Sequence, residues 1–329
     1  MATSIASARA MCVEELRALT APSSWPPLDV ASAPDASFAV IERGELRARC
    51  SAWWTSAPPL PGERVGIVGH FGASSAAAAR EVLDAACAAL YTAGATIAIG
   101  PMDGSTWRRY RLVTNAGTEP PFFLEPTNPE SWQGWLQDAG WTVHTRYFSA
   151  VNEHLAVVDA STPTKAERLA ARGVTIRDLE IARGDSELLA MHDVATRSFR
   201  DSYLYTTLGE EEFAALYRPI LPLVEPRLVS IAEHEGRVVG FCFCVPDATE
   251  RARSGRIESA VLKTFAVLPG YTGLGGVLAA RTNAAARELG YRRVIHALMH
   301  EDNERSRALS ARSAREIRRY ALFERRLRT

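Results

Sequence analysis

The chain has 329 residues, 47% of them hydrophobic, and its 38 basic side chains are balanced by 38 acidic ones. This length is enough for two domains with ordinary cores, and the balanced charge gives no support for nucleic acid or a membrane as a partner. The Ala- and Ser-rich start carries Glu14 and Glu15 and has no apolar core typical of a signal peptide. No apolar run is long enough to cross a membrane, so we expect a cytoplasmic protein.

The cysteines give no sign of a metal site or a disulfide framework. None of them shows the paired spacing of metal ligands, and Cys242 and Cys244 lie two residues apart on one strand. We expect all five to be reduced, buried small residues, and we expect no metal. They are Cys12, Cys50, Cys87, Cys242 and Cys244.

In the first half of the chain, the pattern predicts a hairpin, a strand that ends in a glycine-containing loop, a helix and a further strand. Ser75 is placed to cap the helix, which stops before Gly94. All seven tryptophans lie between Trp25 and Trp141, an asymmetry that favours two separate cores. The predicted segments are 38–41 and 46–53, 65–68, 69–72, 75–90 and 95–99.

In the second half, the pattern predicts a strand, two helices, a hairpin and then a strand, loop, helix and strand. Asp185 is the expected N-cap of the first of these helices, and Gly290 is placed to end the last one. A linker is expected at 159–172. The predicted segments are 174–181, 186–199, 210–217, 228–232, 237–245, 261–267, 277–289 and 294–299.

The order of elements in the two halves is similar. The turn glycines Gly44 and Gly236 are 192 positions apart, and the helix-end glycines Gly94 and Gly290 are 196 apart. A near-constant offset is typical of a tandem duplication. The loop 69–72 lacks the glycine pattern of its counterpart, so the first copy is expected to be degenerate, a support and a wall for the acceptor.

The most informative segment is 267–276, where a strand runs into a glycine-rich loop and then a helix. Glycines and free amides at a helix N-terminus can hold a pyrophosphate. A Walker loop is excluded because Gly276 is followed by Val277 and no lysine follows Lys263. A dinucleotide fold is excluded because 294–299, where the ribose carboxylate is expected, contains no acid.

The segment resembles the acyl-coenzyme A loop of the GNAT superfamily of N-acetyltransferases. Gly273-Leu274-Gly275 fits the loop, whereas Gly270 stands where the family has Arg or Gln. Asn303 matches a motif asparagine and 318–324 is similar to the family's terminal strand. The resemblance covers 174–327.

The resemblance implies an α/β fold of two tandem GNAT-like domains, each with a mixed, mostly antiparallel central sheet flanked by helices. We place a degenerate GNAT-like domain at 1–158, the linker at 159–172 and the acyl-CoA-binding GNAT domain at 173–329. It also implies an N-acyltransferase that transfers an acyl group directly, in a ternary complex, from acetyl-CoA or another acyl-CoA to a small-molecule or peptide amine. The oligomeric state stays open.

The cofactor contacts implied by the resemblance lie on the strand before the loop, on the loop and after the next strand. An added strand-like contact to the pantetheine arm and an oxyanion contact from a backbone N–H belong to the same family pattern. The residues concerned are Phe265, Ala266, Val267, Tyr271, Thr272, Gly273, Leu274, Gly275, Gly276, Asn303 and Ser306.

The catalytic residues are less clearly specified. Glu258 lies near the place of the carboxylate base in some family members, and a surface carboxylate is the alternative. Ser310 stands where the family's acidic tyrosine is usual, so Tyr320 is the candidate proton donor, with an ordinary strand aromatic as the alternative.

For the acceptor, the first two helices of the domain and the strand before the loop supply candidates, which would equally suit a hydrated surface. These are Asp201, Tyr203, Tyr205 and Lys263, with Arg200 and Tyr217 nearby. Two rival functions remain open: a non-catalytic CoA-binding sensor or interaction module, and acyl transfer to a hydroxyl or a carrier thiol.

Overall fold

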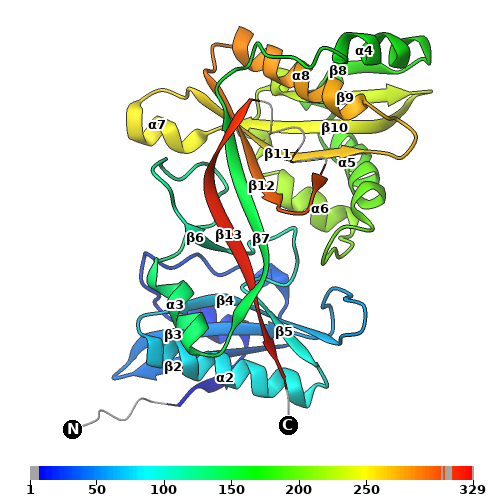
Figure 1. Cartoon of the computed structure of the whole chain (residues 1–329). Coiled ribbons are helices and arrows are strands. Elements are labelled where there is room, and N and C mark those ends of the chain that lie inside the picture. The colour runs from blue at the N-terminus through cyan, green and yellow to red at the C-terminus, as the bar shows by residue number, and fades with distance from the viewer. Residues whose placement is uncertain (1–6, 305–306, 308–312, 328–329) are drawn as a thin grey trace.

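The computed structural model describes residues 7–304, 307 and 313–327, and their strands form one 13-stranded sheet (Figure 1). The order across it is β1-β2-β3-β4-β5-β13-β7-β12-β11-β10-β9-β8, and β6 pairs with β13. The strands are β1 Arg9–Met11, β2 Ala36–Glu42, β3 Glu45–Trp53, β4 Val65–Ala73, β5 Ile97–Gly100, β6 Leu112–Asn115, β7 Thr142–Asn152, β8 Thr175–Asp178, β9 Val229–His234, β10 Arg237–Pro246, β11 Ser259–Val267, β12 Arg293–His300 and β13 Ala314–Arg326.

Helices pack against this sheet in both halves. In the first half α2 and α3 cover one end, and in the second half α5, α6 and α8 cover the other (Figure 1). The helices are α1 Val13–Ala18, α2 Ala76–Thr92, α3 Ser131–Asp138, α4 Thr162–Ala171, α5 Gly184–Phe199, α6 Glu210–Tyr217, α7 Ala248–Ser254 and α8 Leu274–Glu288.

The predicted fold class is confirmed. The pairs β4–β5 and β11–β12 are parallel, and the other strand pairs within the described ranges are antiparallel. Each parallel pair is joined by one helix, α2 in the first half and α8 in the second, and each is preceded by a hairpin. The two halves therefore repeat the same order of elements.

The last strands of the two halves are exchanged. β7, which belongs to the first half, pairs with β12 through Ile295 and Val151, while β13 at the end of the chain pairs with β5 through Phe323 and Gly100. β7 and β13 also pair with each other, and together they run between the two halves in Figure 1. The division of the chain at 159–172 stays a prediction, and this stretch contains α4.

Apolar side chains form one core in each half and a smaller one between them. The core of the second half lies between β9–β12 and the helices α5, α6 and α8, and that of the first half between β2–β5 and α2. The smaller cluster joins side chains from both halves, among them Trp53, Tyr147, Leu204 and Tyr320. The region where the halves meet is thus a packed interior.

Several boundaries differ from the prediction. The segment 69–72 continues strand β4 and is not a loop. Asp185 lies inside the first turn of α5, bonded to Arg218, because the helix already begins at Gly184. Helix α8 begins at Leu274, three residues earlier than predicted. The cap by Ser75, which accepts from the Ala78 amide at 3.2 Å, is confirmed.

The cysteines are free thiols, as predicted, and four of them are buried. The prediction of burial is wrong for Cys12, which is exposed because it caps the short surface helix α1. Within the described part of the chain, no helix is long and apolar enough to span a bilayer, and no group of His, Cys, Asp or Glu could hold a metal ion.

Candidate functional site

The loop between β11 and α8 ends in a helix N-terminus with unused donors. Gly273, with φ at +91°, is the N-cap of α8, a left-handed conformation that glycine adopts without strain. The Val277 amide donates to the Gly273 carbonyl at 3.3 Å, whereas the amides of Gly275 and Gly276 have no acceptor among the described residues. Such free amides, at the positive end of the helix dipole, bind anionic oxygens.

Helix α4 braces this loop from the predicted linker. Arg168 donates through Nη2 to the Thr272 carbonyl at 2.9 Å, and Arg172 through Nη1 to the Gly270 carbonyl at 3.3 Å. On the other side, the Tyr271 hydroxyl is bonded to His234 at 2.8 Å. The loop is therefore held by side chains from two elements outside the strand-loop-helix unit.

Lys165 on α4 brings a positive charge to the same place. Its aliphatic chain packs on Gly273, where an added Cβ would lie 3.0 Å from Lys165 Cδ. The side chain is half-buried and forms no ion pair within the described residues. A cation beside the N-terminus of α8 adds to the attraction for an anion.

The parallel strands β11 and β12 separate halfway along their length. Their last pair is Leu262 with His296, and the rest of β11 pairs only with β10. The strand edge at Phe265–Val267 therefore lacks a partner strand in the described structure and can pair with an extended ligand. Asn303, a predicted cofactor contact, follows the separated end of β12. The predicted contact Ser306, like Ser310, lies outside the described residues.

The corresponding opening in the first half is filled by the chain itself. Beyond the pairs of β4 with β5, the Met102 amide donates to the Val68 carbonyl at 2.9 Å and the His70 amide to Asp103 Oδ1 at 2.6 Å. The fit is so close that a Cβ on Gly69 would lie 2.0 Å from the Met102 carbonyl oxygen. An extended ligand has no room there.

Lys263 is the first residue of β11 after the strands separate. Its side chain is half-buried, and Nζ lies 5.4 Å from the ring centroid of Tyr217 on α6. Burial, and then the charge of Arg111, lower the pKa of Lys263 to about 8. The predicted acceptor contact Lys263 therefore lies at the opening, next to a cation from the other half.

Arg111 comes from the first half and was not found by the sequence reasoning, which assigned that half no site residue. It is 6% exposed, and its guanidinium lies between the rings of Tyr110 and Tyr147, at 3.8 and 4.0 Å from their centroids. Nη1 donates to the Leu298 carbonyl at 2.9 Å, and Nε has no partner. Burial lowers the pKa of Arg111 to about 10.

Two other predicted acceptor residues lie apart from Lys263. Asp201 is exposed to solvent beside Arg200, with 3.7 Å between their charged atoms. Tyr205 is buried against Trp107 of the first half, and its hydroxyl has no partner. Trp107 also donates to the Thr206 carbonyl at 2.9 Å, so the first half forms a wall against the loop between α5 and α6.

Tyr203, on the same loop, reaches the exchanged strands. Its hydroxyl is bonded to His144 Nε2, and His144 Nδ1 is bonded to Glu324. The Tyr203 ring also lies 5.5 Å from the ring of His300, at the separated end of β12. His144 and Glu324 come from β7 and β13, so only the fold brings this polar chain together.

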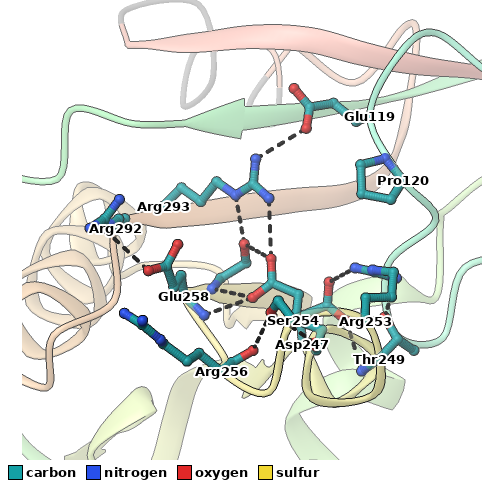
Figure 2. A network of polar contacts seen from close by, with 12 residues as sticks. Glu119, Pro120, Asp247, Thr249, Arg253, Ser254, Arg256, Glu258, Arg292 and Arg293 are labelled. Atoms are coloured by element: carbon teal, nitrogen blue, oxygen red, sulfur yellow. Dashed lines mark hydrogen bonds and ion pairs between the residues drawn. The ribbon is translucent and has the colours of Figure 1, made fainter.

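Glu258 directly precedes β11, at the opposite end of this strand from the glycine loop. Its side chain is 41% exposed, with 3.5 Å between its carboxylate and Arg292. Its amide donates to the buried Glu250 at 2.7 Å. Glu250 also accepts from Ser259 and from Arg293, which in turn bridges to Glu119 of the first half, as Figure 2 shows. Glu258 is thus at the edge of a network that fastens the two halves.

Tyr320 is fully buried. Its hydroxyl donates to Glu125 and lies 3.0 Å from Ser149 Oγ. Burial, and then the Glu125 carboxylate, raise the pKa of Tyr320. Because the hydroxyl is engaged and inaccessible, its surroundings do not support the predicted role as proton donor.

Comparison with known proteins agrees with this geometry. Residues 188–313 match the model of the acetyltransferase (GNAT) family. The chain is 24% identical over 217 residues to a protein named bacterial ceramide synthase from Caulobacter vibrioides, covering 65% of this chain. The matched part spans 56% of that relative's length.

Among solved structures, the fold is similar to a tandem GNAT protein from the clavulanic acid biosynthesis pathway, with a TM-score of 0.50 and 14% identity over 98% of this chain and 99% of that one. A GCN5-related N-acetyltransferase from Sphaerobacter thermophilus gives a TM-score of 0.51 with 11% sequence identity, over 89% of this chain and 81% of that one. A glucosamine N-acetyltransferase region of a fungal multi-domain protein gives a TM-score of 0.53 with 13% sequence identity, over 98% of this chain and 38% of that protein.

Proposed function

Because residues 188–313 match the model of the acetyltransferase (GNAT) family, we propose that this protein transfers an acyl group from acetyl-CoA, or another acyl-CoA, to a small-molecule or peptide amine. The observation that carries the proposal is that the unpaired edge of β11 leads directly to the N-terminus of α8, where two amides are free. The strand edge can bind an extended arm that contains amides, and the helix N-terminus can bind an anion. Acyl-CoA has both parts.

Each part of the site has a role in this reaction. The amides of Gly275 and Gly276, with Lys165, would hold the pyrophosphate, while the edge of β11 would align the pantetheine arm and polarise the thioester carbonyl. The bound acyl-CoA supplies an activated carbonyl. The amine nitrogen attacks that carbon, the C–S bond breaks, and one proton must leave the nitrogen. Glu258 remains the candidate for the base; it lies five positions before Lys263 and is paired with Arg292, so a water relay would have to carry the proton to it.

The experiment has two stages. Acetyl-CoA is first titrated by calorimetry into the wild type and into Gly276→Val, whose side chain would cover the free amides. Thiol release is then followed with a panel of amino acids, peptides and long-chain amino alcohols. We expect saturable binding that the variant lacks, and release with one class of amine. The absence of binding would refute the proposal.

One alternative has an observation of its own. Gly270 provides no side chain where the family has Arg or Gln, and Tyr320 is buried, which would suit a module that binds CoA without turnover. Tight binding of acetyl-CoA without thiol release across amines, alcohols and carrier thiols would favour this reading.

The relative named ceramide synthase suggests one form of the reaction. Ceramide is an N-acylated long-chain amino alcohol, so the panel includes such an amine together with acyl-CoAs of increasing chain length. Preference for a long acyl chain on a long-chain amine would assign this chain a similar activity. Preference for a small polar amine would show that this chain and the relative named ceramide synthase act on different substrates.

A further inference from the structure

Two cations meet where β11 and β12 separate, one from each half of the chain. Lys263 is on β11 and Arg111 is on the segment that precedes β6. Arg111 donates to the Leu298 carbonyl, two positions beyond the last β11–β12 pair, and Lys263 is the first residue of β11 after that pair, so both lie where the strands separate. The charge of Arg111 also lowers the pKa of Lys263. Like charges held together in a partly buried place destabilise the fold unless an anion compensates them.

No carboxylate within the described ranges provides such an anion. Among the described residues, neither Lys263 nor Arg111 forms an ion pair with a carboxylate, although most other arginines in these ranges do. The residues outside the described ranges include no aspartate or glutamate. Arg111 instead contacts one carbonyl oxygen and two aromatic rings.

Arg111 also has an unused hydrogen-bonding group, because its Nε is buried without a partner. A buried polar atom without a partner is costly and points to a group missing from the structure.

The phosphates of the donor do not account for this charge. Val267 lies four positions after Lys263, which is about 13 Å along β11. The loop that would hold the pyrophosphate begins only beyond Val267. The opening at Lys263 is instead the place where the thioester and the attacking amine would meet.

We propose that Arg111 and Lys263 together bind an anionic group, a carboxylate or a phosphate, on the acceptor, so that the substrate is an amine that also carries a negative charge. This inference rests on the proposed function and names its substrate class. Arg111, held against the rings of Tyr110 and Tyr147, presents Nε and the remaining guanidinium edge, and Lys263 adds an ammonium donor from β11. A long-chain amino alcohol, which has no anionic group, would leave both cations unpaired.

The first test measures binding without turnover, and it uses the fact that the chain has only two lysines, Lys165 and Lys263. Both are labelled by reductive dimethylation with ¹³C, and Lys165→Arg assigns the two NMR signals. The charged and titratable groups that act on Lys263 are Arg111 and Tyr217. With CoA bound, the Lys263 signal is titrated in the presence of N-acetylglycine, O-phosphoethanolamine or the neutral N-acetylglycinamide.

An anion near Lys263 favours its charged form, so N-acetylglycine or O-phosphoethanolamine should raise its pKa above about 8, by at least half a unit, and the neutral amide should not. The two anionic probes distinguish a carboxylate from a phosphate acceptor. In Arg111→Met the shift should be lost. The absence of a shift with either anion, or an equal shift with the amide, would overturn the inference.

The second test uses turnover. The ratio of kcat/KM for an amino acid to kcat/KM for its amide is measured for the wild type, and the same ratio is then measured for Lys263→Met and Lys263→Arg. We expect Lys263→Met to reduce the preference for the amino acid at least tenfold through KM, with the KM for acetyl-CoA unchanged, and Lys263→Arg to restore part of it. Equal losses for both amines would contradict the anion site, whereas no turnover with any amine, together with an anion-dependent NMR shift, would refute only the proposed transfer reaction.

Discussion

Gly275 lies against the ring of Phe265 so closely that an added Cβ would come within 2.9 Å of Phe265 Cζ. The neighbouring Gly276 differs, because a Cβ there would meet nothing within 4 Å. The first glycine is needed for packing α8 on β11, and the second leaves room for a ligand above the free amides. The two glycines can therefore be tested separately.

Gly275→Val should destabilise the fold by about 1–3 kcal/mol, because its side chain would displace the Phe265 ring. Gly276→Val should leave the thermal unfolding temperature nearly unchanged and abolish measurable binding of acetyl-CoA. Thermal unfolding and calorimetric titration of both variants check this. Loss of binding only in the unstable variant would show that the loop amides are not the binding site.

Lys165→Glu should weaken acetyl-CoA binding about tenfold, or about 1.4 kcal/mol, because it reverses a charge beside the N-terminus of α8. Lys165→Arg is the matched control and should retain the affinity. The measurement is the Kd for acetyl-CoA at low and moderate salt, and the difference between the variants should shrink as salt screens the charge. Equal affinities for all three proteins would show that Lys165 does not contribute to acetyl-CoA binding.

The stability of the protein should depend on pH through His296, which is 3% exposed at the last β11–β12 pair. Burial lowers its pKa to about 4 from an ordinary 6.5, so the folded protein keeps it neutral while the unfolded chain takes up a proton. Its contribution is complete above pH 6.5 and is lost as the pH falls toward 4, by about 3 kcal/mol.

Urea unfolding of the wild type and of His296→Gln between pH 7.5 and about 4 measures this contribution. The glutamine variant does not titrate in this range, so the difference in unfolding free energy between the two proteins should change with pH, while the acids common to both cancel. A constant difference would show that His296 has the same pKa in the folded and the unfolded state.

Glu250→Gln should cost about 2–4 kcal/mol, because the buried carboxylate accepts from the Glu258 and Ser259 amides and faces Arg293. Burial raises the pKa of Glu250, but its hydrogen bonds outweigh this and hold it below the usual value. Glu258→Gln, at the exposed edge of the same network, should leave stability unchanged and reduce only turnover if Glu258 is the base. Denaturant unfolding and thiol-release rates separate the two effects.

Local sequence signals predicted several elements of the fold well. Helix α6 and the cap of Ser75 are as predicted, and the glycine pattern located the N-terminus of α8 within three residues. These features depend on nearest neighbours in the chain, such as a glycine that permits a left-handed turn or a serine that satisfies a free amide.

The acceptor side depends on contacts between distant parts of the chain, and these leave no local pattern. Arg111 reaches Leu298 across 187 positions, and Tyr203 meets His144 only because the last strands are exchanged. Tyr320 reads as an accessible strand tyrosine until Glu125 covers it from the other half. The surroundings of each of these residues are therefore set by a segment that is distant in the sequence.

The exchange of β7 and β13 also fixes the order in which the protein can be completed during synthesis. The edge of β5 receives its partner only when residues 323–326, more than 200 positions further along the chain, have left the ribosome. Until then the first half presents an open strand edge, and the long strand β7 waits for β12 and β13. The first half is thus translated first but finished last, together with the second half.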